Sequence, residues 1–299
     1  MNRIRKFFQF ENIGYLYVLP ALLYMMYFVG YPIIRNIVLS LQNVTVKTLN
    51  APVKELIGLN NYLELFRDKI MINSLINTLV FTVACLIVQF MIGFALALFL
   101  SRKFASAKMV RGLLMIPWMI PITVTALIFK FIFSTNVGIL NQSLMLLKLI
   151  SAPVDWLTSP GTAMFALVFA NIWIGIPFNM ILLSTGLTII PTELYESASI
   201  DGANRIQSFF RITLPLLKPT IESVLVLGFI YTFKVFDLVY VMTGGGPVNS
   251  THMLSTYAYK LSFGIFQYSK GAAVANIMFV VLLIVSLFYL KLTYEEEEA

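Results

Sequence analysis

Residues 70–101 read IMINSLINTLVFTVACLIVQFMIGFALALFLS and contain no Asp, Glu, Lys or Arg. A helix that crosses a lipid bilayer needs about 20 consecutive apolar residues, so this stretch is long enough for one crossing. It holds Cys85, the single cysteine of the chain, which is expected to act as a small hydrophobic side chain. The stretch predicts a membrane-spanning helix, and no disulfide can form within the chain.

The whole chain has the composition of a membrane protein. Hydrophobic residues make up 59% of it, charged residues 12%, and the mean hydropathy is +0.85. A water-soluble fold could not bury so many apolar side chains in one core. Four further stretches of suitable length contain no charged residue: 12–34, 112–129, 156–192 and 271–290. A less regular apolar stretch at 217–242 brings the number of predicted spans to six. We therefore predict an all-α, polytopic fold with six transmembrane helices.

Two charged residues, Lys234 and Asp237, lie within the less regular span. Side chains three apart share a helix face, so these two can neutralise each other. At about 1.5 Å per residue they would lie near the outer membrane surface. This interpretation is preferred to an intramembrane charge relay of the kind found in proton-coupled carriers.

The net charge of +7 comes from basic residues scattered between the apolar stretches, which argues against a nucleic-acid-binding face. Cytoplasmic loops of membrane proteins are enriched in Lys and Arg. With the N-terminus inside, the inner segments hold eleven basic residues: Arg3, Arg5, Lys6, Arg102, Lys103, Lys108, Arg111, Arg205, Arg211, Lys218 and Lys291. The longer outer segments hold seven: Lys47, Lys54, Arg67, Lys69, Lys148, Lys260 and Lys270. Both termini are therefore predicted to be cytoplasmic.

The first 34 residues, with a basic start and an apolar stretch, also fit a secretory signal. Residues 12–34 exceed the usual signal core of about 7–15 residues, and no small-residue cleavage site follows them. We therefore expect an uncleaved first helix. The four glutamates at 295–298 are expected to form a solvated tail.

Residues 195–219, YESASIDGANRIQSFFRITLPLLKP, form a polar stretch between two apolar spans. Thr192 after Pro191 is a suitable N-cap, and Glu193 and Glu196 favour a helix start. Asp201-Gly202 predicts a turn in which Asp201 caps a second helix that begins near Ala203. Apolar residues at helical spacing give that second helix one apolar face, which ends at Pro215; they are Ile206, Phe209, Phe210 and Thr213. From the pattern alone, the stretch is either an interfacial helical hairpin or a docking site for a soluble partner.

Seven residues of this stretch resemble the EAA motif of permease subunits of bacterial binding-protein-dependent ABC importers. The motif reads Glu-Ala-Ala, three residues, Gly, nine residues, Ile, one residue, Leu-Pro. Ser197 departs from its second position, and the others match in register: Glu196, Ala198, Gly202, Ile212, Leu214 and Pro215. Further segments, ITLPLLKP and FKVFDLVYVMTGGGP, are similar to the maltose and multiple-sugar branch of these importers.

This resemblance implies the type I ABC importer permease fold in a single transmembrane domain over residues 1–299. Residues 1–69 would hold the first helix and an outer loop, residues 70–292 the core, and residues 191–215 the coupling loop. In this family the coupling loop docks on a separate ATPase. There Glu196 would offer a charge at the docking surface, Ala198 would keep the helix slim, and Gly202 would allow a sharp turn. Asp201 would act as a helix cap. The expected partners are a second homologous permease, two ATPase subunits and an extracytoplasmic sugar-binding protein, all at the bacterial cytoplasmic membrane.

No enzyme chemistry is expected in this chain. It has no G-x-x-x-x-G-K-[ST] loop to hold phosphates, so ATP and Mg would be bound by the partner ATPase. Its only histidine, His252, is expected to be exposed in an outer loop, which leaves no histidine pair for a metal and no convincing base for a nucleophile. The chain is therefore expected to carry no cofactor or metal of its own.

Two helix faces are candidates for the substrate pathway. Asn171, Ile174, Gly175 and Phe178 follow the spacing i, i+3, i+4 and i+7, and the same spacing recurs at Gly228, Tyr231, Thr232 and Val235. The resemblance implies that these faces contact sugar, whose apolar surfaces stack on aromatic rings and whose hydroxyls match polar side chains. The alternative is ordinary helix–helix packing, with Gly for close approach and Asn for an interhelical hydrogen bond. Import of another small polar solute, or ion-coupled secondary transport, is a further alternative.

Overall fold

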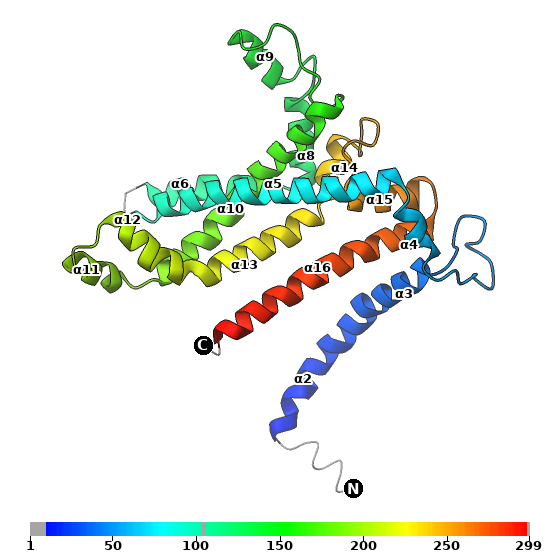
Figure 1. Cartoon of the computed structure of the whole chain (residues 1–299), viewed down its shortest axis with the longest axis horizontal. Helices are drawn as coiled ribbons and strands as arrows, with labels where there is room; N and C mark the ends of the chain where they lie inside the picture. Colours follow the sequence, from blue (N-terminus) through cyan, green and yellow to red (C-terminus); the bar gives the residue numbers. More distant parts are fainter. Residues whose placement is uncertain (1–9, 103–105, 298–299) are drawn as a thin grey trace. The chain divides into compact units, whose positions relative to one another are not determined.

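The computed structural model describes residues 10–102 and 106–297. Apart from one isolated bridge between Gln42 and Leu56, the regular structure of these residues is helical, which confirms the predicted all-α fold. The α-helices in Figure 1 are α2 (Phe10–Met25), α3 (Tyr31–Ser40), α4 (Asn60–Leu65), α5 (Lys69–Leu100), α6 (Ala107–Leu114), α7 (Ile116–Met119), α8 (Ile122–Ile132), α9 (Ile139–Leu146), α10 (Pro160–Ile189), α11 (Thr192–Ile200), α12 (Arg205–Ser208), α13 (Leu214–Phe233), α14 (Asp237–Met242), α15 (Leu254–Tyr259) and α16 (Tyr268–Glu297). Three π-helical turns adjoin them: Met26–Gly30, Phe209–Thr213 and Lys260–Gly264.

Five helical segments are long and apolar enough to cross a membrane: Tyr17–Ser40, Lys69–Leu100, Pro160–Ile189, Arg205–Met242 and Tyr268–Lys291. They coincide with five of the six predicted spans. Four of the basic residues predicted on the inner side, Arg3, Arg5, Lys6 and Lys103, lie outside the described residues, as does Glu298 of the acidic tail.

The predicted span at 112–129 is not one straight helix. Ala107–Met119 and Ile122–Ile132 meet at an angle of 91°, so they make a sixth span only if the bent pair is counted as one. Ile120 is extended, with φ −76° and ψ 134°, because the ring of Pro121 disfavours a helical conformation in the residue before it. Pro121 also lacks the N–H that would continue the helical hydrogen bonds.

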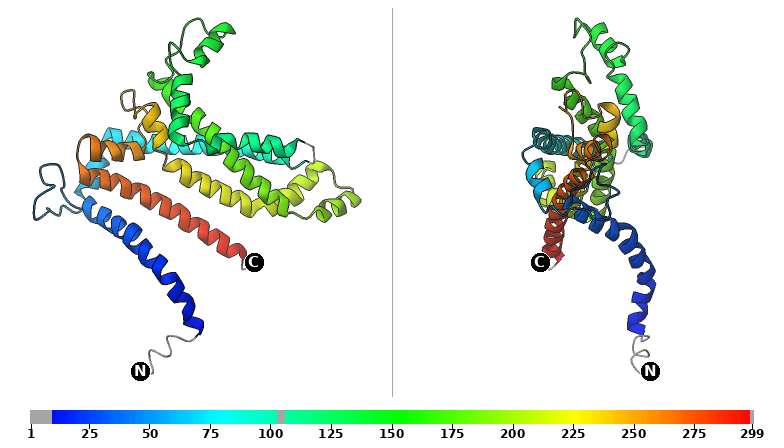
Figure 2. Two further views of the ribbon diagram at one scale, coloured as in Figure 1. Left: turned by 180° about the vertical axis from the view of Figure 1, so that it is seen from behind. Right: turned by 90° about the vertical axis from the view of Figure 1, so that its right-hand side faces the viewer.

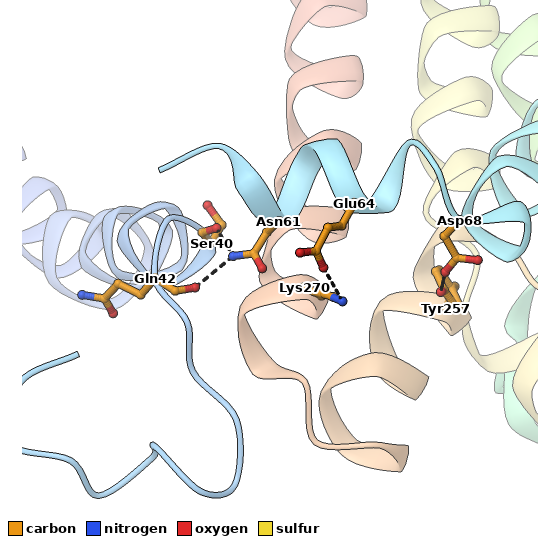
Figure 3. A network of polar contacts seen from close by, with 7 residues as sticks. All are labelled: Ser40, Gln42, Asn61, Glu64, Asp68, Tyr257 and Lys270. Atoms are coloured by element: carbon orange, nitrogen blue, oxygen red, sulfur yellow. Dashed lines mark hydrogen bonds and ion pairs between the residues drawn. The ribbon is translucent and has the colours of Figure 1, made fainter. Parts of the chain in front are cut away.

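The chain divides into two compact units, residues 1–65 with 258–277 and residues 66–257 with 278–299. The single domain expected from the sequence stays a prediction. In the first unit, Asn276 of α16 donates hydrogen bonds to the hydroxyl oxygens of Ser40, at 2.9 Å, and Tyr62, at 3.1 Å. Lys270 lies 2.8 Å from the carboxylate of Glu64 (Figure 3). These contacts tie the start of α16 to α3 and α4.

The second unit contains the long helices α5, α10 and α13. Its main core is a cluster that draws on α5, α8, α10 and α14 and includes Phe81, Cys85, Phe129, Leu167 and Leu238. Cys85 is fully buried there, as expected for a small hydrophobic side chain. At one end of α10 the chain runs through α8 and α9, and at the other end it enters α11 and α12 (Figures 1 and 2).

The start of α5 is held by Asp68. Its Oδ1 accepts the N–H of Ile70 at 2.8 Å, which caps the helix, and its Oδ2 accepts the hydroxyl of Tyr257 (Figure 3). Burial, with the neighbouring Asp68 carboxylate, raises the pKa of Tyr257 above its ordinary value, so the hydroxyl remains a donor. One carboxylate thus joins α5 to α15.

Replacing Asp68 with Ala is expected to lower the stability of the full chain. The loss of an N-cap costs about 1 kcal/mol, and a buried hydroxyl left without its acceptor costs roughly another 1–3 kcal/mol. Thermal unfolding in detergent measures the effect, with Asp68→Asn as the control that keeps an acceptor oxygen for the cap. Equal melting temperatures for the Ala variant and the unaltered chain would contradict this role.

Candidate functional site

A cavity of about 270 Å³ lies within the second unit, lined by residues of α5, α7, α8, α10, α13, the start of α14 and the segment between α13 and α14. All eight residues predicted for the substrate pathway line it: Asn171, Ile174, Gly175, Phe178, Gly228, Tyr231, Thr232 and Val235. The two predicted helix faces are therefore brought together around one space.

One wall of the cavity is aromatic. The rings of Trp118 and Phe178 are stacked with centroids 6.2 Å apart, and Phe178 meets Tyr231 edge to face at 5.5 Å. Tyr231 is 58% exposed. Rings arranged in this way offer flat apolar surfaces, while Asn171 and Thr232 add hydrogen-bonding groups beside them.

The glycines of the two faces also serve close helix packing. A Cβ added to Gly175 would lie 2.3 Å from the side chain of Gln89 on α5, and one on Gly228 would lie 2.9 Å from Leu86. The packing interpretation therefore describes the glycines correctly, although the same residues line the cavity.

Six further residues line the cavity that the spacing argument did not include: Gln89, Trp118, Ile122, Lys234, Phe236 and Asp237. Gln89, Trp118 and Ile122 come from other helices, and a pattern within α10 or α13 gives no signal for them. The polar Gln89 inside an uncharged span was the one available hint.

The predicted pairing of Lys234 with Asp237 on one helix face was wrong, while their position near the outer membrane surface stays a prediction. The span does not continue as one regular helix, because α13 ends at Phe233 and α14 begins at Asp237, so the two residues flank a break. The Nζ of Lys234 lies over the ring of Tyr231, 5.2 Å from its centroid, and no ion pair joins Lys234 to Asp237 in the described part of the chain. Both charges therefore belong to the cavity lining.

His252 was predicted to be exposed, and this too was wrong, since only 4% of its surface is exposed. Its Nδ1 lies 3.2 Å from the hydroxyl of Thr256, and its ring lies where a side chain on Gly245 would be. Gly245 has φ +88°, a conformation that glycine adopts without steric cost. The triple-glycine loop thus folds over His252, a tertiary contact that the local sequence does not reveal.

The coupling loop, residues 191–215, begins with α11. The N–H of Gly202 donates to the carbonyl of Ser199 at 3.1 Å, and that of Ala203 donates to Ala198 at 2.8 Å. Gly202 has φ +82°, so this helix end is a Schellman motif with glycine at its left-handed position. Asp201 closes α11 instead of starting the second helix, because Asn204 and Gln207 form the capping box of α12.

Pro215 does not end the second helix as predicted. The helix passes from α12 through the π-helical turn Phe209–Thr213 directly into α13, where Pro215 occupies the first turn. A proline ring crowds the carbonyl four residues earlier, and a widened turn is one way in which a helix accommodates such a residue. The loop is therefore continuous with a membrane-spanning helix.

Four of the seven predicted coupling residues line one hollow of about 360 Å³. Ala198, Asp201, Gly202 and Ile212 line it, Glu196 is exposed on α11, and Leu214 and Pro215 lie in the first turn of α13. Of the predicted apolar face, Phe209 packs 5.9 Å from Phe94 of α5 and Thr213 is buried, whereas Ile206 and Phe210 are exposed. Ile200, at the end of α11, is 86% exposed.

Comparison with known proteins agrees with this architecture. The family model for a binding-protein-dependent transport system inner membrane component matches residues 89–293. The chain is 34% identical to the trehalose/maltose transport system permease protein of Thermococcus litoralis, over 94% of this chain and 93% of the relative.

Solved structures agree in the same way. A bacterial ABC transporter involved in the import of the acidic polysaccharide alginate superposes with a TM-score of 0.82 and 26% identity, covering 98% of this chain and 99% of the other. A second alginate ABC transporter structure, in complex with an alginate pentasaccharide-bound periplasmic protein, has a TM-score of 0.79 and 25% identity, covering 96% and 94%. This multi-pass membrane chain belongs to the family of inner membrane components, or permease subunits, of binding-protein-dependent ABC transport systems.

Proposed function

We propose that this chain is a transmembrane permease subunit of an ATP-driven importer for a sugar or oligosaccharide. The observation that carries the proposal is the cavity in which both predicted helix faces meet beside the rings of Trp118, Phe178 and Tyr231. Aromatic rings with amide and hydroxyl groups at their edges fit the alternating apolar and polar surfaces of a saccharide. The sugar relatives support the same substrate class.

The proposal includes the partners and the orientation expected from the sequence. A second permease subunit, two ATPase subunits that bind ATP and Mg, and an extracytoplasmic sugar-binding protein would complete the transporter. Both termini and the coupling loop would lie on the cytoplasmic side, where Glu196, Ile200 and the hollow beside Gly202 would meet the ATPase.

The direct test is reconstitution of the assembled complex in liposomes. Uptake of maltose or trehalose should require ATP, the ATPase subunits and the binding protein together. Transport of an amino acid or another small polar solute in place of any sugar would favour the alternative substrate. Uptake by this chain alone, driven by an ion gradient, would show a secondary transporter instead.

Tyr195 joins α11 of the coupling loop to the π-helical turn Phe209–Thr213, which leads directly into α13. Its hydroxyl lies 2.9 Å from the hydroxyl of Thr213, which is 6% exposed. Tyr195→Phe is expected to lower the amount of sugar moved per ATP hydrolysed roughly fivefold, since a single hydrogen bond contributes about 1 kcal/mol. Tyr289→Phe is the matched control, because it removes a similar hydroxyl contact, to Ser223 of α13 at 2.8 Å, outside the loop. Equal transport ratios in the two variants would argue against the proposed link.

A further inference from the structure

Gln89 is the one residue of the long helix α5 that lines the cavity. Its side chain is 3% exposed and its Nε2 donates a 2.8 Å hydrogen bond to the carbonyl oxygen of Asn171 on α10. A Cβ on Gly175 would lie within 2.5 Å of Cδ, Nε2 and Oε1, so the amide group rests directly on the backbone of that glycine. The side chain therefore has a fixed position at the cavity wall.

Within the described residues only the Nε2 of this amide group makes a hydrogen bond, and Oε1 makes none. This oxygen is not fully buried. Since the rest of the side chain is buried, Oε1 must keep some access at the cavity wall. A positioned acceptor of this kind can accept a hydrogen bond from a hydroxyl group.

A second amide makes the same packing contact but does not reach the cavity. Asn179 is 1% exposed and donates from Nδ2 to the carbonyl of Gly175 at 2.9 Å. Its Cβ would lie 2.5 Å from one added to Gly93, so α5 and α10 exchange an amide and a glycine one helical turn apart. Asn179 is therefore the control for amide–glycine packing between the two helices, although its hydrogen bond stays within α10 whereas that of Gln89 joins α5 to α10.

We propose that Gln89 is a further substrate-binding residue, whose Oε1 accepts a hydrogen bond from one saccharide hydroxyl while Nε2 holds the amide against α10. This inference rests on the proposed sugar transport. It makes α5 a specificity-determining wall of the cavity, in addition to the helices whose sequence pattern indicated a site.

The test uses the complete transporter in liposomes, with maltose, trehalose and their monodeoxy derivatives bound to saturating binding protein. With the unaltered chain, removing the hydroxyl that Gln89 contacts should slow uptake about tenfold, the usual cost of an acceptor left without its donor. Gln89→Met keeps the side-chain volume against Gly175 but removes the acceptor oxygen. Uptake of the intact sugar by this variant should be slower by a similar factor. Uptake of the derivative that lacks the contacted hydroxyl should be no slower than uptake of the intact sugar by the same variant. Asn179→Leu should keep the discrimination of the unaltered chain.

The outcomes separate the two proposals. If Gln89→Met discriminates between sugar and deoxy derivatives as the unaltered chain does, or if Asn179→Leu abolishes discrimination equally, Gln89 acts only in packing and the inference is wrong. If the unaltered complex transports no sugar, the proposed function is wrong, and the role of Gln89 is lost with it. Gln89→Glu adds an internal check, since its carboxyl group keeps acceptor oxygens and should retain part of the discrimination.

Discussion

Replacing Gly202 with Asp is expected to reduce uptake at least tenfold, while the subunit still folds and reaches the membrane. Gly202 has φ +82°, and a residue with a Cβ adopts this conformation at a cost of about 1–2 kcal/mol. No atom lies within 4 Å of the position that an added Cβ would take, so the isolated chain has room for a side chain there. In the proposed complex, that open space is where the ATPase would approach. Uptake in liposomes and the amount of subunit in the membrane measure the two effects.

Gly202→Asn distinguishes backbone strain from loss of docking. Asn adopts positive φ more readily than most residues and carries no charge, so it should restore the fold of the turn but not the close approach of the ATPase. We therefore expect Asn to fail in uptake as well. Gly58→Asp, at another glycine with positive φ and open space around it, outside the candidate spans, controls for the added charge and the backbone strain. Normal uptake by the Gly202→Asp variant would contradict the proposed coupling role of the loop.

Replacing Phe178 with Ala is expected to reduce sugar uptake about 30-fold, because a lost stacking surface is worth roughly 2 kcal/mol. Phe178 lies at the centre of the aromatic wall, between Trp118 and Tyr231. Removal of its ring therefore takes away the contact that connects Trp118 and Tyr231, and it also widens the cavity. Initial rates of uptake at saturating binding protein provide the measurement.

Phe178→Tyr keeps the ring and should retain most of the uptake. Phe131→Ala provides the matched control, since Phe131 is 60% exposed on α8 and does not line the cavity. If the two alanine variants reduce uptake to the same extent, the effect comes from general loss of packing. The aromatic wall would then have no specific part in transport.

Local features of the chain were largely predictable from the sequence. The uncharged stretch around Cys85 predicted the spanning helix α5, since a bilayer imposes a length and an apolar composition on each crossing. The spacing of Asn171, Gly175 and Phe178 placed them on one helix face because the helical period is fixed. Gly202 was identified as a turn residue by its conformational freedom.

Other features required the tertiary structure. The bend before Pro121 and the break between Phe233 and Asp237 brought Trp118, Lys234 and Asp237 to the cavity, and no periodic pattern reports such interruptions. The burial of His252 depends on a glycine loop folded over it.

The sequence by itself determined which residues share a helix face and which stretches can cross a membrane, because these follow from the helical repeat and the thickness of the bilayer. Only the tertiary structure decided which faces meet. Gln89 on α5 and Gly175 on α10 are far apart in the chain, and their contact depends on helix packing that no local pattern encodes.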